Sequence, residues 1–244
     1  MIKSSVPKFE SYYTKRRVVA SYEEKRFKGF GGKYVDENET GLIVEMTKSY
    51  DREGRRVLDV GAGKGRLAMA LRKVGFDVFC LDSSPEMIKI LKKYFSNDRI
   101  FLQSAFDPIN INFKFDSITS LRFFDHLELE NQKKVLENLV GYLEKRGFLT
   151  YSALNKCSLE ALLSKYLSYG KQNYFYGDND FRKVFKNLGL RVRLARGRFF
   201  LPRGVFLHLT KIPYLLQILI LLDRSLSTIF PKFNSYLVYL LEFQ

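Results

Sequence analysis

Short runs of apolar, β-favouring residues alternate along this chain with segments in which apolar residues recur every three or four positions. The short runs predict strands that are buried on both faces, and the helical spacing predicts helices that cover them. The expected strands are residues 57–60, 77–82, 100–103, 115–121, 147–152, 190–195 and 235–243. Strands that alternate with helices indicate an α/β fold built on a doubly wound, mostly parallel sheet.

Two further regions predict helices at the ends of this pattern. Residues 9–50 precede the first strand and contain an aromatic-flanked turn at 28–34, in which Gly31-Gly32 predicts a lid hinge. The alternative is a helical extension that only packs on the sheet. Residues 214–229 predict one buried or interfacial helix before the last strand. Ser84 and Asp178 stand where helices begin, and both are expected to be N-cap residues.

The first predicted strand runs directly into three glycines at alternate positions, Gly61, Gly63 and Gly65. Glycine tolerates a positive φ and lets a ligand approach the main chain closely. Apolar residues at helical spacing begin at Leu67, so the segment is predicted to be a strand, a glycine loop and a helix. The start of a helix presents free N–H groups and a positive dipole end, which favours a nucleotide-like ligand in this loop.

The spacing of the glycines distinguishes two kinds of nucleotide site. The dinucleotide fingerprint is Gly-x-Gly-x-x-Gly, whereas this chain has Asp59-x-Gly61-x-Gly63-x-Gly65. A carboxylate beside the loop disfavours a pyrophosphate and favours a ligand that carries an ammonium and a sulfonium. The pattern resembles the first motif of the class I S-adenosylmethionine-dependent methyltransferases. The alternative is a glycine-rich turn of the kind found in any α/β protein.

Two more segments strengthen this resemblance. Asp82 ends the second strand nineteen residues after Gly63, where an acid in a Rossmann-like unit accepts hydrogen bonds from ribose hydroxyls. The run from Asp82 to Met87, Asp-Ser-Ser-Pro-Glu-Met, is similar to the family's second motif. The fourth strand begins Phe-Asp-Ser-Ile at Phe115, which also follows the family pattern.

The resemblance covers about residues 35–195 and implies a fold, a cofactor and a reaction. The implied fold is a seven-stranded sheet whose last strand is antiparallel, with an N-terminal helical lid and a helix inserted in the terminal hairpin. In one composite domain, residues 1–50 would form the lid, 51–156 the cofactor-binding core, and 157–244 the substrate-side insertion, the remaining strands and a basic apolar tail. The implied reaction is an SN2 transfer of the sulfonium methyl group of S-adenosyl-L-methionine.

The resemblance also assigns cofactor-binding residues. The methionine part would contact the glycine loop, the ribose would contact the end of the second strand, and the adenine would lie after the third strand. Leu121, which ends the fourth strand, is assigned to the same site. The full set is Asp59, Gly61, Ala62, Gly63, Asp82, Ser83, Met87, Ser104, Ala105, Phe106 and Leu121. Ser104 departs from the family, which usually has an acid at that position.

The loop after the fourth strand contains the candidate catalytic residues. His126 is one of two histidines and is the best candidate for a general base, which is needed only if the acceptor must lose a proton. The alternative is a loop histidine that bonds to Asp125. Arg122 is a candidate anchor for a substrate carboxylate or phosphate. The loop lacks Asn-Pro-Pro-Tyr, which argues against methylation of the exocyclic amines of nucleic-acid bases.

Composition adds information about partners and compartment. With 244 residues, of which 46% are hydrophobic, the chain can bury a sizeable core. Its two cysteines, Cys80 and Cys157, have neither metal-ligand nor disulfide spacing, so we expect no metal. The first residues lack an apolar signal core, which favours a cytoplasmic protein, peripheral at the membrane if its tail binds there.

The net charge of +15 is concentrated near the C-terminus. Residues 181–224 contain ten Lys or Arg and one acid, and such a patch attracts phosphates. Arg196, Arg198 and Arg203 run into the apolar stretch 205–222, which is typical of a segment that lies on an anionic membrane surface. A solvated basic surface over a buried tail is the alternative.

The sequence does not identify the methyl acceptor. An aromatic lid, a tyrosine-rich insertion at 166–176 and the apolar tail favour a small-molecule or lipid-like acceptor. A nucleic-acid (RNA) methyltransferase is the second hypothesis, and it rests on net charge alone. A non-catalytic subunit that binds S-adenosylmethionine is the third, because the first motif is complete and the catalytic base is not evident.

Overall fold

The computed structural model describes residues 29–50, 55–164, 173–208 and 213–244. A central sheet contains eight strands, in the order β3-β2-β1-β4-β5-β8-β7, with β6 paired to β5. The strands are β1 (Arg56–Val60), β2 (Asp77–Asp82), β3 (Ile100–Leu102), β4 (Phe115–Ser120), β5 (Leu143–Asn155), β6 (Phe175–Tyr176), β7 (Leu190–Arg198) and β8 (Tyr236–Phe243). Neighbours are parallel except that β8 is antiparallel to both β5 and β7. The predicted mostly parallel sheet is confirmed, with the two-residue β6 as an addition.

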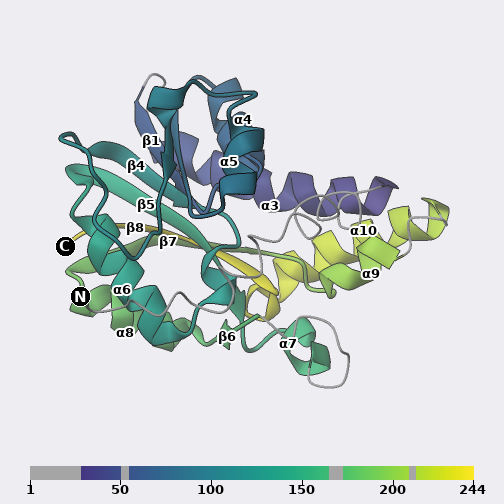
Figure 1. Ribbon diagram of the computed structural model, residues 1–244. Helices are drawn as coiled ribbons and strands as arrows, with labels where there is room; N and C mark the ends of the chain where they lie inside the picture. The colour runs from purple at the N-terminus through teal and green to yellow at the C-terminus, as the bar shows by residue number, and fades with distance from the viewer. Residues whose placement is uncertain (1–28, 51–54, 165–172, 209–212) are drawn as a thin grey trace.

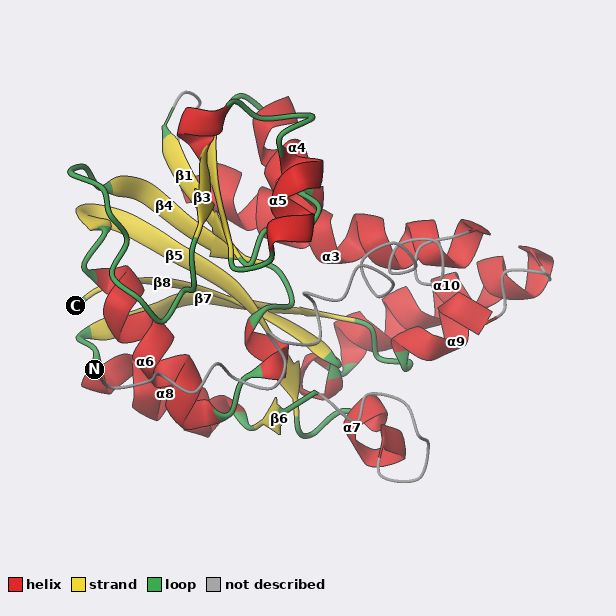
Figure 2. Ribbon diagram, in the orientation of Figure 1, coloured by secondary structure: helices red, strands yellow, loops and turns green. Residues whose placement is uncertain are grey.

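Helices cover both faces of the sheet (Figures 1 and 2). They are α3 (Gly29–Tyr50), α4 (Arg66–Lys73), α5 (Pro85–Leu91), α6 (Leu129–Val140), α7 (Leu159–Ser164), α8 (Asp178–Asn187), α9 (Arg203–His208) and α10 (Pro213–Ile229), with short 3-10 turns η1 (Asn97–Arg99), η2 (Phe124–His126) and η3 (Pro231–Phe233). One apolar cluster joins the sheet to α3, α4, α5, α9 and α10, and a second joins it to α6 and α8. Along β8, Val238 and Leu240 belong to the first cluster and Tyr239 and Leu241 to the second, because successive side chains of a strand point to opposite faces.

The predicted hairpin with an inserted helix is present. β7 and β8 pair antiparallel from Leu190 with Phe243 to Arg198 with Tyr236, and the chain between them contains α9 and α10. In Figure 1, α9, α10 and the first half of α3 project beyond the sheet as an arm. The arm leaves the sheet on the side where the parallel strands end, so it stands beside the edge at which α/β sheets bind ligands.

The glycine pair predicted as a hinge lies instead inside a helix. α3 continues without a break through Gly31 and Gly32, and both glycines are buried. Two residues later, Tyr34 packs against Phe206 of α9 with ring centroids 5.0 Å apart. Packing against α9 therefore overrides the low helix propensity of glycine, a cost of ~1 kcal/mol per residue. The helices expected within residues 9–28 lie outside the described residues.

The two predicted helix caps have different outcomes. Ser84 caps α5 as predicted, because its Oγ accepts a hydrogen bond from the Met87 N–H at 3.3 Å. Asp178 is not the cap of α8 but its first residue, and Gly177 holds the N-cap position. Asp180 accepts the Gly177 N–H at 3.0 Å, which leaves Asp178 to accept the Tyr239 hydroxyl at 2.9 Å. The Asp178 side chain, which the local sequence pattern predicted to cap α8, therefore makes a tertiary contact to β8 instead.

Candidate cofactor and acceptor site

The glycine loop between β1 and α4 has the left-handed backbone that its sequence requires. Gly61, Gly63 and Gly65 have φ values of +68°, +55° and +86°. A Cβ at Gly61 would lie 2.6 Å from the Phe123 Cβ, and one at Gly65 would lie 2.7 Å from Leu91 Cδ2. A Cβ at Gly63 would meet no described atom within 4 Å. Packing therefore accounts for the outer two glycines, and the space beside Gly63 is available to a ligand.

Asp82 connects this loop to the end of β2. Its Oδ2 accepts the Gly63 N–H at 2.7 Å, and its Oδ1 accepts the Ser84 N–H at 2.9 Å. Burial raises the pKa of Asp82 above its ordinary value, while these N–H bonds oppose the rise. The side chain remains half-buried rather than enclosed, so a hydroxyl-bearing ligand can reach it. The sequence analysis predicted a ribose contact here but missed the link to the loop.

Asp59 is the most unusual carboxyl group at this edge. It is 1% exposed, and neither carboxylate oxygen has a hydrogen-bond partner among the described residues. Burial raises its pKa to about 8, with the charge of Asp82 contributing and the charge of Arg66 opposing. A cationic group bound beside it would stabilise the ionised form. The ammonium of S-adenosylmethionine therefore fits this residue.

The segment predicted to hold adenine follows β3 beside Asp82. The Gln103 N–H donates to the Asp82 carbonyl oxygen at 3.1 Å, which sets the next three residues at the same edge. Ala105 is buried, and its carbonyl oxygen accepts the Asn138 side-chain N–H at 3.0 Å. Ser104 accepts the Phe106 N–H at 3.3 Å. The structure thus gives this segment an apolar wall and a half-buried serine.

Four other predicted residues lie around the same edge. Met87 is buried at 5% exposure, while Ser83 and Leu121 are half-buried. Leu121 follows β4 directly, and Ala62 is buried within the glycine loop. The predicted cofactor residues therefore come together where β1, β2, β3 and β4 end.

Arg122, the predicted substrate anchor, is largely enclosed. It is 4% exposed, and its Nη1 donates to Glu39 Oε1 of α3 at 2.6 Å. Its backbone has a φ of +64°, which is unusual for a residue with a side chain, and its N–H donates to Ser152 Oγ at 2.8 Å. The loop after β4 is thus held in a strained conformation by contacts to β5 and α3.

Glu39 binds two further arginines, a cluster that the sequence analysis missed. Arg203 Nη1 of α9 donates to its Oε1 at 2.8 Å, and Arg66 Nη2 of α4 donates to its Oε2 at 3.1 Å. Arg203 is also held by Glu160, at 2.7 Å and 3.0 Å. Burial alone would raise the pKa of Glu160, but the charge and hydrogen bonds of Arg203 hold it below its ordinary value. The expectation that Arg203 belongs to an exposed basic patch is wrong, because it is 1% exposed.

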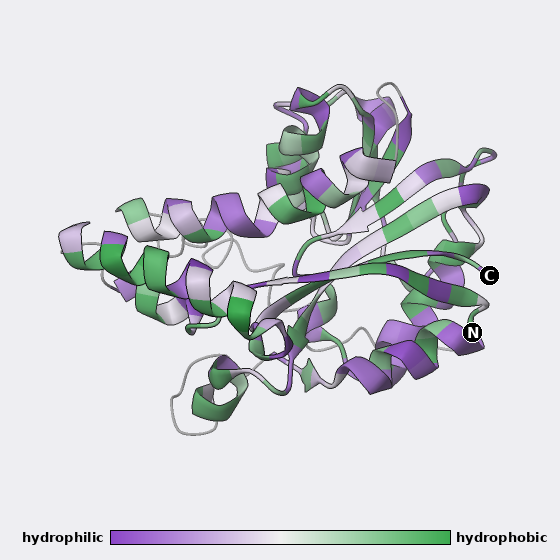
Figure 3. Cartoon of the chain, turned by 180° about the vertical axis from the view of Figure 1, so that it is seen from behind, coloured by the Kyte–Doolittle hydropathy of each residue, from purple (hydrophilic) through white to green (hydrophobic). Residues whose placement is uncertain are grey.

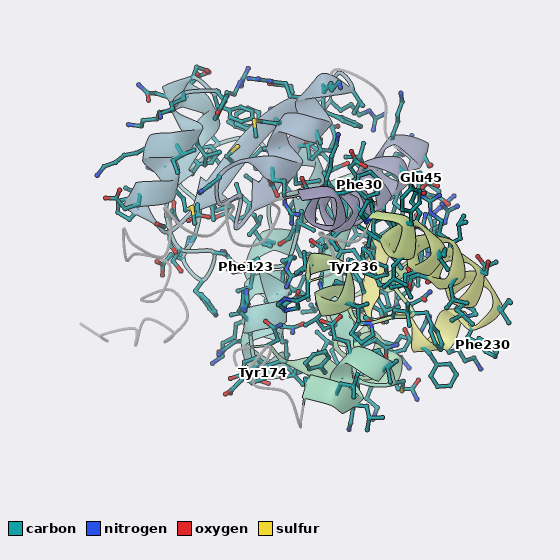
Figure 4. All side chains as sticks on the ribbon, turned by 90° about the vertical axis from the view of Figure 1, so that its right-hand side faces the viewer. Phe30, Glu45, Phe123, Tyr174, Phe230 and Tyr236 are labelled. Carbon is teal, nitrogen blue, oxygen red and sulfur yellow. The ribbon has the colours of Figure 1, made fainter. Side chains whose placement is uncertain are left out.

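The predicted base lies in η2, directly after this strained turn. His126 is half-buried, and its neighbour Asp125 is buried. The Tyr174 N–H donates to the Asp125 carbonyl oxygen at 2.8 Å, and the Tyr176 hydroxyl accepts the Leu129 N–H at 2.8 Å. Part of the tyrosine-rich insertion therefore packs against the loop that carries His126. Figure 4 views this side of the molecule, with Phe123 and Tyr174 labelled.

Comparison with known sequences gives one family and several enzymes. The model of a methyltransferase-domain family matches residues 37–195. The ubiquinone biosynthesis O-methyltransferase of Rickettsia felis is 28% identical over 119 residues, which are 47% of this chain and 48% of that protein. The mitochondrial enzyme of the same name from Schizosaccharomyces pombe is 26% identical over 117 residues, 46% of this chain and 42% of that protein. The chain spans about half the length of the curated relatives it matches.

Solved structures share the fold at lower identity. Magnesium protoporphyrin IX methyltransferase (ChlM) from Synechocystis PCC 6803 with bound SAH has a TM-score of 0.66 and 15% identity, covering 97% of this chain and 98% of that chain. Haemonchus contortus phosphoethanolamine N-methyltransferase 2, in complex with S-adenosyl-L-methionine, has a TM-score of 0.64 and 17% identity, covering 98% of this chain and 61% of that chain.

Proposed function

Because the chain belongs to the methyltransferase-domain family, we propose that it transfers the methyl group of S-adenosylmethionine to a small-molecule or lipid-like acceptor. The family uses S-adenosylmethionine, as the motifs around Gly63 and Asp82 predicted. Its relatives named for ubiquinone biosynthesis support a small-molecule acceptor. The observation that carries the proposal is the open space beside Gly63, next to the Asp82 carboxylate.

The residues around this space have distinct roles in the proposal. Asp59 and the backbone of Gly61–Gly63 hold the methionine part, and the Asp82 carboxylate accepts the ribose hydroxyls. The segment from Ser104 to Phe106 holds the adenine. Ser83, Met87 and Leu121 complete the surroundings. S-adenosylmethionine supplies a methyl group that is already activated, so the main contribution of the chain is alignment and exclusion of water.

The acceptor would bind beside the loop after β4, next to Tyr174 and Tyr176 of the tyrosine-rich insertion. Tyr174 and Tyr176 lie against that loop and offer apolar rings with polar ends, which suits an aromatic or lipid-like acceptor. His126 would remove a proton from an acceptor hydroxyl. Arg122 is already bound to Glu39, so its contribution in the proposal is to position this loop. An anchoring contact from Arg122 to substrate stays a prediction.

The basic patch gives weaker support for a nucleic-acid acceptor than its sequence suggests. Arg191 and Arg193 pair with Glu242, at 2.7 Å and 2.9 Å, and Arg196 pairs with Glu45. These acids lie outside residues 181–224, so they were not counted in the patch. They neutralise part of its charge, and Arg203 is buried. The phosphate contacts on which nucleic-acid affinity depends would have to displace these pairs.

Two matched glycine variants test the cofactor site. Gly63→Ala and Gly189→Ala both place a Cβ at positive φ in free space, so both carry the ~1–2 kcal/mol cost of left-handed backbone. Only Gly63 lies in the proposed site, since Gly189 follows α8. Titration calorimetry should show that Gly63→Ala loses S-adenosylmethionine binding and that Gly189→Ala retains it. Equal binding by both variants, or heat from NAD alone, would overturn the assignment.

The acceptor class requires a separate experiment. We expect S-adenosylmethionine with a labelled methyl group to label phenolic small molecules extracted into organic solvent. Incubation with total RNA under the same conditions should leave the RNA unlabelled. Label in RNA would favour the nucleic-acid hypothesis. Cofactor binding without label in any acceptor class would favour the non-catalytic subunit.

A further inference from the structure

Helix α10 has an apolar face on each side. Leu216 and Ile220 on one side are buried against the rest of the fold. The other side carries large apolar side chains that are exposed, with Tyr214 at 81%, Ile218 at 62% and Leu221 at 64%. This outer face comprises Tyr214, Leu215, Ile218, Leu221, Leu222 and Ile229. A helix that is apolar nearly all round is otherwise expected in a core or at a membrane.

The spacing of these residues places them in one stripe. Starting from Tyr214, Ile218, Leu221, Leu222 and Ile229 follow at four, seven, eight and fifteen positions, which is the period of one helix face. Phe230 and Phe233 of the following turn are also exposed, at 45% and 48%. Figure 3 shows that green, apolar residues recur along α10, and Figure 4 shows Phe230 at the surface of the projecting arm. Contiguous apolar surface of this kind marks an interaction site.

The exposed charges of α9, α10 and the turn that follows have one sign. From residue 203 to 233 the sequence contains a single acid, Asp223. Asp223 is buried, and it accepts hydrogen bonds from the Leu201 N–H at 2.8 Å and the Tyr34 hydroxyl at 3.3 Å. Among the described residues of this range, the exposed charged side chains are the cations Arg224 and Lys232. Within residues 203–233, the charged side chains that the structure describes on the surface are therefore cations only.

We propose that the outer face of α10 lies on an anionic lipid bilayer. Aliphatic and aromatic side chains with cations beside them are the composition of helices that bind in the plane of a membrane. Within the described ranges, the structure contains no helix of the length and hydropathy needed to cross a bilayer. A second copy of the chain is a poorer partner, because a symmetric contact of this face would place cations of both copies in one interface with no exposed acid from residues 203–233 to pair them.

The membrane-binding surface proposed here differs from the one that the sequence suggested. The predicted cationic cluster was Arg196, Arg198 and Arg203, but Arg203 is buried, and Arg196 and Arg198 face Glu45. The apolar residues on the surface lie on α10, which also carries Arg224, and Lys232 follows in the next turn. The inference does not rest on the proposed methyl transfer, because binding to lipid is measured without cofactor or acceptor.

Vesicle sedimentation of the full chain tests the proposal with two matched double variants. Ile218→Ser with Leu221→Ser removes two exposed apolar side chains from the outer face. Leu102→Ser with Leu162→Ser makes the same chemical change at leucines that are 56% and 53% exposed elsewhere. Each protein is mixed with phosphatidylcholine vesicles, or with vesicles that also contain phosphatidylglycerol. Circular dichroism and thermal unfolding verify that every variant is folded.

We expect the unmodified chain and the Leu102/Leu162 variant to sediment with anionic vesicles, less with neutral ones, and less at high salt. The Ile218/Leu221 variant should partition about 10- to 100-fold more weakly, in proportion to the apolar area removed. Recovery of the unmodified chain in the supernatant in all conditions would overturn the proposal. So would equal binding by both double variants. A dimer that the Ile218/Leu221 variant dissociates, without binding to vesicles, would identify a second copy as the partner instead.

Discussion

Glu39 of α3 and Arg122 of the loop after β4 form a buried ion pair, with Oε1 and Nη1 separated by 2.6 Å. The two residues are 83 positions apart in the chain. The pair joins the first described helix to the loop that carries the candidate base, and it holds Arg122 in its left-handed conformation. Arg66 and Arg203 bind the same carboxylate, so one acid connects α3 with α4, α9 and the loop after β4.

Glu39→Gln should lower the free energy of unfolding strongly. Removing one partner of a buried ion pair costs about 3–5 kcal/mol, because the other charge is left without compensation. Glu45→Gln is the matched control on the same helix, since Glu45 is an exposed acid that pairs with Arg196 (Figure 4). An exposed pair contributes ~0–1 kcal/mol. Urea unfolding of both variants decides the matter, and equal losses would contradict a special role for the buried cluster.

Asp82→Ala should weaken S-adenosylmethionine binding by ~1–3 kcal/mol, because the ribose hydroxyls lose their acceptor. It should also lower the free energy of unfolding by about 1 kcal/mol, since the Gly63 and Ser84 N–H groups lose theirs. Asp77→Ala at the other end of β2 is the control, where only a partly exposed pair with Arg99 is lost. Calorimetry and urea unfolding measure the two effects separately. A loss of stability with unchanged affinity would make Asp82 a structural residue only.

The burial of Asp59 predicts a dependence of stability on pH. Its pKa in the folded protein is about 8, above the ordinary value of 3.8, so between these values the folded state holds a proton that the unfolded state has released. The free energy of unfolding should therefore fall as pH rises through this window and level off above pH 8, by at most ~1.4 kcal/mol per pH unit from this group. Asp59→Asn should flatten that slope. An unchanged slope in the variant would show that other groups cause it.

His126→Ala should lower the turnover number by ~10²- to 10⁴-fold if the acceptor loses a proton to this residue. Cofactor affinity should stay the same, because His126 lies in η2 beyond the cofactor residues. His208→Ala removes the other histidine of the chain, which is exposed in α9, and serves as the control. Steady-state rates with a soluble acceptor and calorimetry with S-adenosylmethionine give both numbers. Equal rates for the two variants would mean that His126 is not the base.

Local patterns of the sequence determined most of the sheet and the cofactor edge. Apolar runs of strand length located the parallel strands, and the antiparallel hairpin with its inserted helix followed from the family resemblance. The glycine loop and Asp82 were recognisable because positive φ and a carboxylate at a strand end are requirements of single positions. The N-cap role of Ser84 was equally local, since its bond reaches only three residues along the chain.

Tertiary structure alone decided the features that depend on distant partners. Nothing near Glu39 in the sequence indicates that Arg203, 164 positions away, will bind its carboxylate. Gly31 and Gly32, expected to form a hinge, lie in a helix because α3 packs against α9. Asp178, expected to be an N-cap, instead accepts a hydrogen bond from the Tyr239 hydroxyl of β8. Helix α10 has large apolar side chains on both of its faces, so only the folded chain could show which face remains exposed. Hydropathy sets how much apolar surface a segment has, whereas the arrangement of its neighbours decides which part of that surface is buried.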